Sequence, residues 1–142
     1  MPHFDPRDSL GFHCNLTVKA FLAAWNLKGT GVSRAQLMAI AQLVALGPLS
    51  QSELAGLLSI TRATGVRLID RMERDGWVIR QPDLKDGRIK LVSLTEKTVA
   101  VWKKISGTGK KVMNKAYRGV PPADIETVKR VLEQVRRNLK EN

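Results

Sequence analysis

Three arginines and a threonine share one predicted helix near the middle of the chain: Arg62, Thr64, Arg67 and Arg71. A guanidinium group can donate two parallel hydrogen bonds to O6 and N7 of guanine, which discriminates between bases by about 1–3 kcal/mol. It also pairs well with phosphate. We expect Arg62 and Thr64, in the first turn, to contact base edges, and Arg67 and Arg71 to contact phosphates or base edges. The alternative is a basic helix face that is only solvated.

A second group of cations lies in or beside a predicted hairpin loop: Lys85, Arg88 and Lys90. A narrow minor groove has an enhanced negative potential, and Arg88 is the side chain best placed to enter it. Asp86 cannot face phosphate favourably. We therefore expect Asp86 to pair with a neighbouring arginine, either stabilising the hairpin or orienting a side chain of the arginine helix.

Local sequence signals define the elements that must position these cations. Ser50 and Glu53 form a capping box, which predicts a helix from there to about Leu58. Thr61 is the cap of the arginine helix, which is expected to end at Arg74, before Gly76. Ser50 and Ser52 are expected either to donate to phosphate or only to cap their helix. Residues 77–80 and 90–94 are predicted strands, joined by the polar loop.

Four further helices are predicted around this centre, at about 9–27, 34–46, 96–118 and 122–140. Along the second of these, Leu37, Ile40, Ala41 and Val44 are expected to face inward. The last has a narrow apolar stripe with alternating spacings of three and four, which is typical of paired helices. Its members are Ile125, Val128, Leu132, Val135 and Leu139.

Size and charge limit the possible functions. The chain has 142 residues, and its 24 Lys and Arg against 13 Asp and Glu give a formal net charge of +11. Such an excess indicates a polyanionic partner. No apolar run approaches the roughly 20 residues that span a bilayer. The first residues lack the apolar core of a signal peptide. We expect a cytoplasmic protein without membrane contact.

The order of elements predicts a mainly α fold with a small β-hairpin wing, in which a winged helix-turn-helix is flanked by helices. We assign residues 33–98 to this winged helix-turn-helix as the DNA-binding domain. Residues 1–32 form the N-terminal helix region, and residues 99–142 form the C-terminal helices.

Several motifs of the central segment, taken as a set, resemble the MarR family of bacterial transcription regulators. They are LSQSELAGLL at the capped helix, TRATGVRLIDRMERDGWVIR at the arginine helix, and DGR followed by LVSLTEKT at the wing. The chain departs from the family pattern at Gly65, where a β-branched apolar residue is usual. That glycine either allows another backbone to approach closely or loosens the helix.

The resemblance implies a homodimeric regulator that binds double-stranded DNA at a pseudo-palindromic operator, with half-sites about one helical turn apart. It implies a repressor whose DNA affinity a small-molecule effector modulates. The resemblance also implies that the N-terminal helix of residues 1–32 and the C-terminal helices of residues 99–142 are dimerisation helices. The apolar stripe of the last helix is the expected dimerisation surface. A row on the preceding helix is expected to join it: Trp102, Ile105, Gly109, Val112 and Ala116.

Other candidate sites are weak. Cys14 is either a redox switch or a small buried side chain, and His3, His13 and Cys14 lack the spacing of a metal site. We expect no metal, no cofactor and no catalytic site. Trp25 is either a core aromatic or part of an effector pocket. A basic face on residues 96–118 is either solvated or a second contact to DNA or an anionic effector: Lys104, Lys111, Lys115 and Arg118.

One alternative function remains open on the sequence. A winged-helix module can bind a protein or an anionic surface through its basic face without reading a DNA sequence. Affinity for duplex DNA that never exceeds the affinity for random sequence would favour this alternative.

Overall fold

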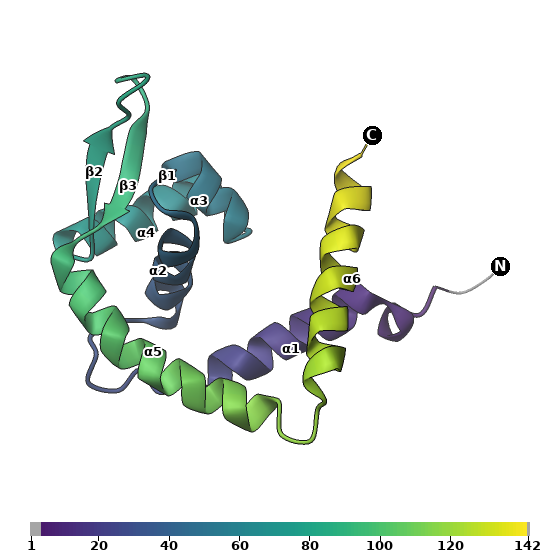
Figure 1. Cartoon of the computed structure of the whole chain (residues 1–142). Coiled ribbons are helices and arrows are strands. Elements are labelled where there is room, and N and C mark those ends of the chain that lie inside the picture. The colour runs from purple at the N-terminus through teal and green to yellow at the C-terminus, as the bar shows by residue number, and fades with distance from the viewer. Residues whose placement is uncertain (1–3, 142) are drawn as a thin grey trace.

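A lobe of short helices and strands lies at one end of the molecule, and two long helices extend from it (Figure 1). The computed structural model describes residues 4–141. Its elements follow in this order: η1 (Pro6–Asp8), α1 (Leu10–Ala24), α2 (Arg34–Leu46), β1 (Leu49–Ser50), α3 (Gln51–Leu57), α4 (Arg62–Arg74), β2 (Val78–Pro82), β3 (Lys90–Leu94), α5 (Glu96–Ala116) and α6 (Pro122–Lys140). The predicted fold class, mainly α with a β-hairpin wing, is confirmed.

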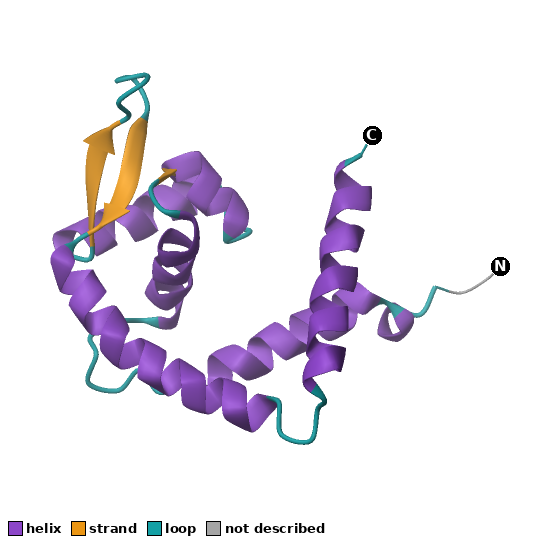
Figure 2. Cartoon of the chain, viewed as in Figure 1, coloured by secondary structure: helices purple, strands orange, loops and turns teal. Residues whose placement is uncertain are grey.

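The strands form one antiparallel sheet in the order β1-β3-β2 (Figure 2). Val78 of β2 pairs with Leu94, and Leu49 of β1 pairs with Val92, so β3 is the central strand. The hairpin was predicted, although β2 runs over residues 78–82 and not 77–80. The two-residue strand β1 was missed, because its pairing with β3 is a tertiary contact that leaves no local pattern.

The lobe is built around side chains from α2, α3, α4 and the sheet. Its most completely buried large side chains are Ile40, Leu54, Ile69, Met72, Val78, Val92 and Thr98. The inner face expected for α2 was partly wrong. Leu43 is 3% exposed and belongs to the core, whereas Val44 is 42% exposed. The buried face of α2 is therefore rotated from the predicted one.

Helix starts follow the sequence signals closely. Ser50 accepts a hydrogen bond from the Glu53 N–H while the Glu53 side chain accepts from the Ser50 N–H, completing the predicted capping box. Thr61 and Thr95 cap α4 and α5 as predicted. Gly76, with φ at 79°, follows the C-cap of α4 in a left-handed conformation that favours glycine.

Helix ends were predicted less well. The first helix stops at Ala24, not near Leu27, because Trp25 adopts an extended backbone. The fifth helix ends at Ala116 and not near Arg118. The end of α4 is marked by a left-handed glycine that follows its C-cap, and neither α1 nor α5 has a glycine at that position. The helical periodicity of apolar residues also continues a few residues past the true ends of both helices.

Most of the apolar row on α5 packs within the chain, whereas Ala116 at its end is exposed. Ile105, Gly109 and Val112 are buried, and Trp102 packs against the core. A Cβ atom at position 109 would lie 2.5 Å from the Trp25 ring, so Gly109 makes room for that tryptophan. Trp25 is therefore a packing aromatic at the joint between α1 and α5. The periodicity predicted burial correctly, but it could not identify which surface covers the row.

The two outer helices contain no buried residue among those described. In α6 the apolar stripe is half-buried at Ile125, Leu132 and Val135, while Val128 is 53% and Leu139 80% exposed. In α1 apolar side chains such as Leu16 are also exposed, and no residue is buried. Figure 1 shows α6 rising beside α1 away from the winged lobe.

Candidate nucleic-acid interface

The position of α4 is fixed by close contact with α3. Gly65, Ile69 and Met72 form its buried stripe. A Cβ atom at position 65 would lie only 2.9 Å from the Ala55 Cβ, so the two helices approach where Gly65 has no side chain. This confirms the first of the two roles considered for Gly65, the close approach of another backbone. The arginines of α4 are consequently turned outward.

One hollow brings together predicted residues from three elements. It lies between the start of α3, the start of α4 and the hairpin, and it includes five of the predicted contacts: Ser50, Ser52, Arg62, Arg88 and Lys90. These residues are up to 40 positions apart in the chain, so their convergence is a property of the fold. They form the first candidate surface, which we call the wing-side surface.

A second hollow lies on the other side of α4. Thr64, Arg67 and Arg71 line it together with Met38 of α2 and Ile60 of the turn. Residues two positions apart in an α-helix are separated by about 200° around its axis. Arg62 and Thr64 therefore point to opposite sides, Arg62 towards the hairpin and Thr64 with the two later arginines. They do not form the single pair of base readers that the sequence suggested.

The serine hydroxyls differ in how they are used. The Ser50 oxygen accepts a hydrogen bond from the Glu53 N–H at 3.2 Å. Its own hydrogen stays available, because a hydroxyl donates and accepts at once. Ser52 is exposed in the first turn of α3. Hydrogen bonds from Ser50 hold the pKa of the Glu53 carboxyl below its usual value.

Asp86 and Arg88 form an ion pair at the tip of the hairpin. The Arg88 Nε–H donates to the Asp86 Oδ1 at 3.1 Å, and the Arg88 backbone N–H donates to the same oxygen at 3.1 Å. These hydrogen bonds hold the pKa of Asp86 below its usual value. The Arg88 side chain is nevertheless 92% exposed, so its outer guanidinium edge faces solvent. Lys85 is exposed on the same loop but borders neither hollow.

Arg80 of β2 is a positioning residue that the sequence reasoning missed. Its guanidinium donates to the Asp70 carboxylate at 2.5 Å and also to Glu73, both on α4. It donates to the Gln51 Oε1 of α3 from two nitrogens, at 3.0 and 3.2 Å. Only 16% of this side chain is exposed. One side chain therefore ties the wing to both helices of the helix-turn-helix.

The Arg80 pairs also shape the charge of α4. Asp70 and Glu73 are two acidic groups of that helix, and Arg80 holds both. Within residues 4–141, Arg62, Arg67 and Arg71 form no ion pair. The outward face of α4 therefore presents cations whose charge is not balanced by its own acidic side chains. The sequence signal that could have indicated these pairs is the spacing of three residues between Asp70 and Glu73, followed by Arg80 in the next predicted strand.

The other candidates from the sequence remain weak. His3 lies outside the described residues, and the His13 ring contacts the Arg7 carbonyl at 2.8 Å. Within residues 4–141, no three His, Cys, Asp or Glu side chains are grouped so that they could hold a metal ion. Cys14 is half-buried on α1. None of the described helices is both long and apolar enough to cross a membrane.

Comparison with known proteins matches the winged lobe to one family. The profile of the MarR family matches residues 32–90. Three relatives are the uncharacterised HTH-type transcriptional regulator YybA of Bacillus subtilis, the HTH-type transcriptional repressor IacR of Pseudomonas putida and the transcriptional activatory protein BadR of Rhodopseudomonas palustris. YybA is 26% identical over 79% of this chain, IacR 27% over 66% and BadR 36% over 52%. The matches span 75%, 56% and 47% of these relatives respectively.

A solved structure extends the likeness to the outer helices. A MarR family transcriptional regulator from Silicibacter pomeroyi aligns with a TM-score of 0.83, covering 100% of this chain and 97% of its own, at 20% identity. At that identity the likeness shows the fold. The family match shows that residues 32–90 form a domain of the MarR family, and the sequence relatives include proteins named as transcriptional regulators.

Proposed function

We propose that two copies of this chain bind a pseudo-palindromic DNA site, with α4 of each copy in a major groove and each hairpin beside the adjacent minor groove. The observation that carries the proposal is the wing-side surface, where Ser50, Ser52, Arg62, Arg88 and Lys90 converge. Hydroxyl donors at a helix start, an arginine at the next helix start and two cations on a hairpin form a combination suited to phosphates and groove edges.

The two sides of α4 take different roles in this proposal. Arg62 lies with the hairpin and contacts the backbone or the groove edge near it. Thr64, Arg67 and Arg71 share one side of the helix. That side is the better candidate for base contacts, because three polar side chains on successive turns can follow one groove. Arg88 enters the minor groove, and Lys85 and Lys90 contact phosphates.

Dimerisation is supported by the uncovered outer helices. A 19-residue amphipathic helix such as α6 gains most of its stability from packing of its apolar face, and no described residue of α6 is buried. The same holds for α1. A second copy would cover Ile125, Val128, Leu132, Val135 and Leu139 together with the exposed side chains of α1. In this proposal α6 serves dimerisation, while Ile105, Gly109 and Val112 of α5 pack within their own chain.

Control by a small molecule is part of the same proposal. An apolar hollow of about 700 Å3 lies between α1, the end of α5 and the start of α6, with Phe21, Tyr117 and Val112 among its lining residues and Lys115 as a cation in it. This volume is within the usual range for ligand sites. An apolar anion bound there would favour one spacing of the two lobes over another. IacR and BadR carry opposite regulatory names, and we propose the repressor role for this chain, acting in the cytoplasm.

Selection of bound sites from random-sequence duplexes tests the proposal. We expect an enriched consensus with two-fold symmetry and half-sites about one helical turn apart. Selection without enrichment, at an affinity equal to that of the starting pool, would contradict sequence reading and favour an interaction module. An enriched site without symmetry would contradict the dimer.

A further inference from the structure

Six basic side chains follow the outward face of α5 and the turn after it. We call them the α5 strip: Lys103, Lys104, Lys110, Lys111, Lys115 and Arg118. All six residues are exposed. The pairs 103–104 and 110–111 are seven residues apart, so they are separated by about 10.5 Å along the helix axis. The strip is therefore a straight row of cations on a regular element.

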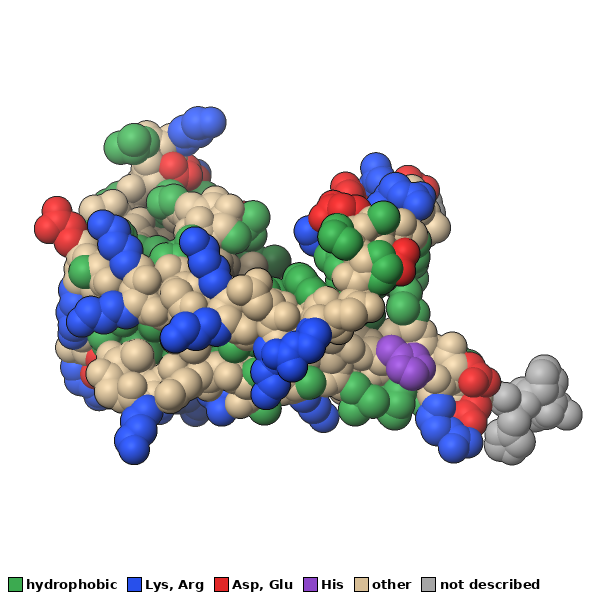
Figure 3. Space-filling model, turned by 60° about the horizontal axis from the view of Figure 1, so that its bottom comes forward, with side chains coloured by type: hydrophobic (Ala, Val, Ile, Leu, Met, Phe, Trp, Pro, Cys, Tyr) green, Lys and Arg blue, Asp and Glu red, His purple; other side chains and the backbone are tan. Residues whose placement is uncertain are grey.

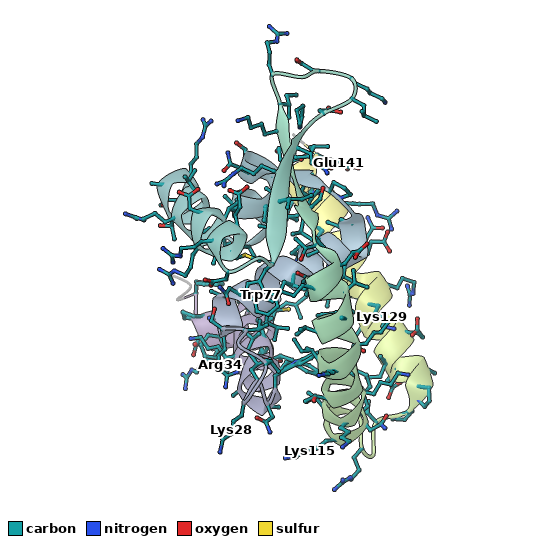
Figure 4. All side chains as sticks on the ribbon, turned by 90° about the vertical axis from the view of Figure 1, so that its left-hand side faces the viewer. Lys28, Arg34, Trp77, Lys115, Lys129 and Glu141 are labelled. Carbon is teal, nitrogen blue, oxygen red and sulfur yellow. The ribbon has the colours of Figure 1, made fainter. Side chains whose placement is uncertain are left out.

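The lysines at 103, 104, 110 and 111 face away from the rest of the chain, whereas Lys115 also borders the hollow between α1, α5 and α6. The opposite side of α5 is the buried one, formed by Thr98, Ile105, Gly109 and Val112. Lys97 near the start of α5 is not part of the strip. Its ammonium group donates to the Asp75 carbonyl at 2.7 Å and lies over the Trp77 ring, and so stabilises the end of α4. Figure 4 shows Trp77 at the junction of lobe and helix, and Lys115 at the far end of α5.

The strip has no acidic neighbours in sequence. No Asp or Glu occurs between Glu96 and Asp124, and in the described part of the chain, residues 4–141, no member of the strip forms an ion pair. A face that is only solvated usually mixes both signs of charge. On α6 the charges are mixed, and Lys129 pairs with Glu126 at 2.7 Å. The underside of the molecule shows the contrast, with blue side chains along its middle and red beside blue at one end (Figure 3).

The chemistry of the strip favours a polyphosphate over a protein. Protein interfaces are anchored by Trp, Tyr and Arg side chains and are depleted in lysine. Between the lysine rows the strip offers only small exposed residues, Ala100, Gly107 and Asn114. Lysines on a convex helix supply charge without shape, which is what sequence-independent attraction to the DNA backbone requires.

We propose that the α5 strip binds the phosphate backbone of a second DNA duplex while α4 and the hairpin hold the first. The hairpin tip extends from the lobe in one direction, and α5 leads away in another (Figure 1). A duplex on the wing-side surface therefore leaves the strip uncovered. The binding of the first duplex by α4 and the hairpin is the proposed function described above, and this further proposal rests on it. A dimer carries two strips and can join separate DNA segments.

A capture assay tests this proposal. A selected duplex is anchored to beads and saturated with protein, and a fluorescent random-sequence duplex is added at increasing salt. We expect the wild type to capture the second duplex at low salt. The α5 variant combines Lys103→Gln, Lys104→Gln, Lys110→Gln and Lys111→Gln. It should lose capture at least tenfold, and the slope of log K against log salt should fall by about 3.6, at about 0.9 per phosphate contact.

A matched control separates local from total charge. The α6 variant combines four exposed changes: Lys129→Gln, Arg130→Gln, Arg136→Gln and Lys140→Gln. It loses the same charge and should capture the second duplex within twofold of the wild type. Equal capture by the wild type and the α5 variant, equal losses in both variants, or no capture by the wild type would overturn the proposal.

Binding of the anchored duplex is measured in the same samples, so failure of the proposed function is seen separately. If no selected duplex is bound, the α5 strip is tested by titrating the protein with random-sequence duplex to saturation and measuring the number of duplexes bound per protomer. The wild type should then bind more duplexes per protomer than the α5 variant, and equal stoichiometry would overturn the proposal. Light scattering checks that both variants keep the assembly of the wild type.

Discussion

Gly65 of α4 lies directly against Ala55 of α3, where a Cβ atom at position 65 would be 2.9 Å from the Ala55 Cβ. Neither atom can move without its backbone. Glycine inside a helix costs about 0.8–1.0 kcal/mol relative to alanine, and this cost is accepted here because the two helices need the space. The absence of a side chain at Gly65 therefore allows α4 to lie in close contact with α3.

Gly65→Ala should destabilise the protein despite its better helix propensity. Overpacking a tight contact costs about 1–3 kcal/mol, so we expect a net loss of about 1 kcal/mol or more in urea unfolding at fixed protomer concentration. Adding Ala55→Gly should relieve the overlap. If the double variant is no more stable than the two single effects predict by addition, the close contact is not the cause.

Gly107 and Gly109, two residues apart on α5, should respond to alanine in opposite directions. A Cβ atom at 107 meets open space, so Gly107→Ala should stabilise by about 0.8–1.0 kcal/mol. A Cβ atom at 109 would lie 2.5 Å from Trp25, so Gly109→Ala should destabilise by about 1–3 kcal/mol. Thermal unfolding of both variants checks the pair, and a gain at both positions would exclude tight packing of Trp25.

Loss of Arg80 should disturb both stability and DNA reading. Arg80→Met removes hydrogen bonds to two carboxylates and Gln51, which we expect to cost about 1.5–3 kcal/mol. Arg80→Lys should recover less than half, because an ammonium group lacks the planar fork of a guanidinium. Arg74→Met is the control, since Arg74 is 73% exposed, and should change stability by less than about 0.5 kcal/mol.

The same variants separate positioning from simple stability. If Arg80 orients the wing against α4, Arg88→Ala should weaken DNA binding much less in the Arg80→Met background than in the wild type. Equal effects of Arg88→Ala in both backgrounds, at a temperature where both proteins are folded, would show that Arg80 is only structural.

The fold was largely readable from local signals, while the contacts that complete the site were not. Ser50, Thr61 and Thr95 each act on the following turn of their own helix, so a short window reveals them. Arg80 finds its partners 7 to 29 residues away, and β1 exists only by pairing with β3. Periodicity likewise showed which face of α5 is buried but not that Trp25 covers it.

The hairpin should not respond to pH near neutrality. Hydrogen bonds from Arg88 lower the folded-state pKa of Asp86, so the ion pair contributes fully above the ordinary aspartate pKa, about 3.9. The contribution is lost only as pH falls through the lowered value. Carbon-13 NMR of the Asp86 carboxyl should show no titration between pH 5 and 8. A midpoint above the ordinary aspartate value would contradict the pairing.

The affinity ratio between a selected and a scrambled duplex, measured by gel shift at one salt concentration, tests the central claim most directly. For the wild type we expect a ratio of about 10³ or more. Arg67→Ala and Arg88→Ala should each weaken binding of the selected duplex by about tenfold, while the α6 variant should stay within twofold. If both arginine variants bind the selected duplex as tightly as the wild type, α4 and the hairpin do not read DNA in the way proposed.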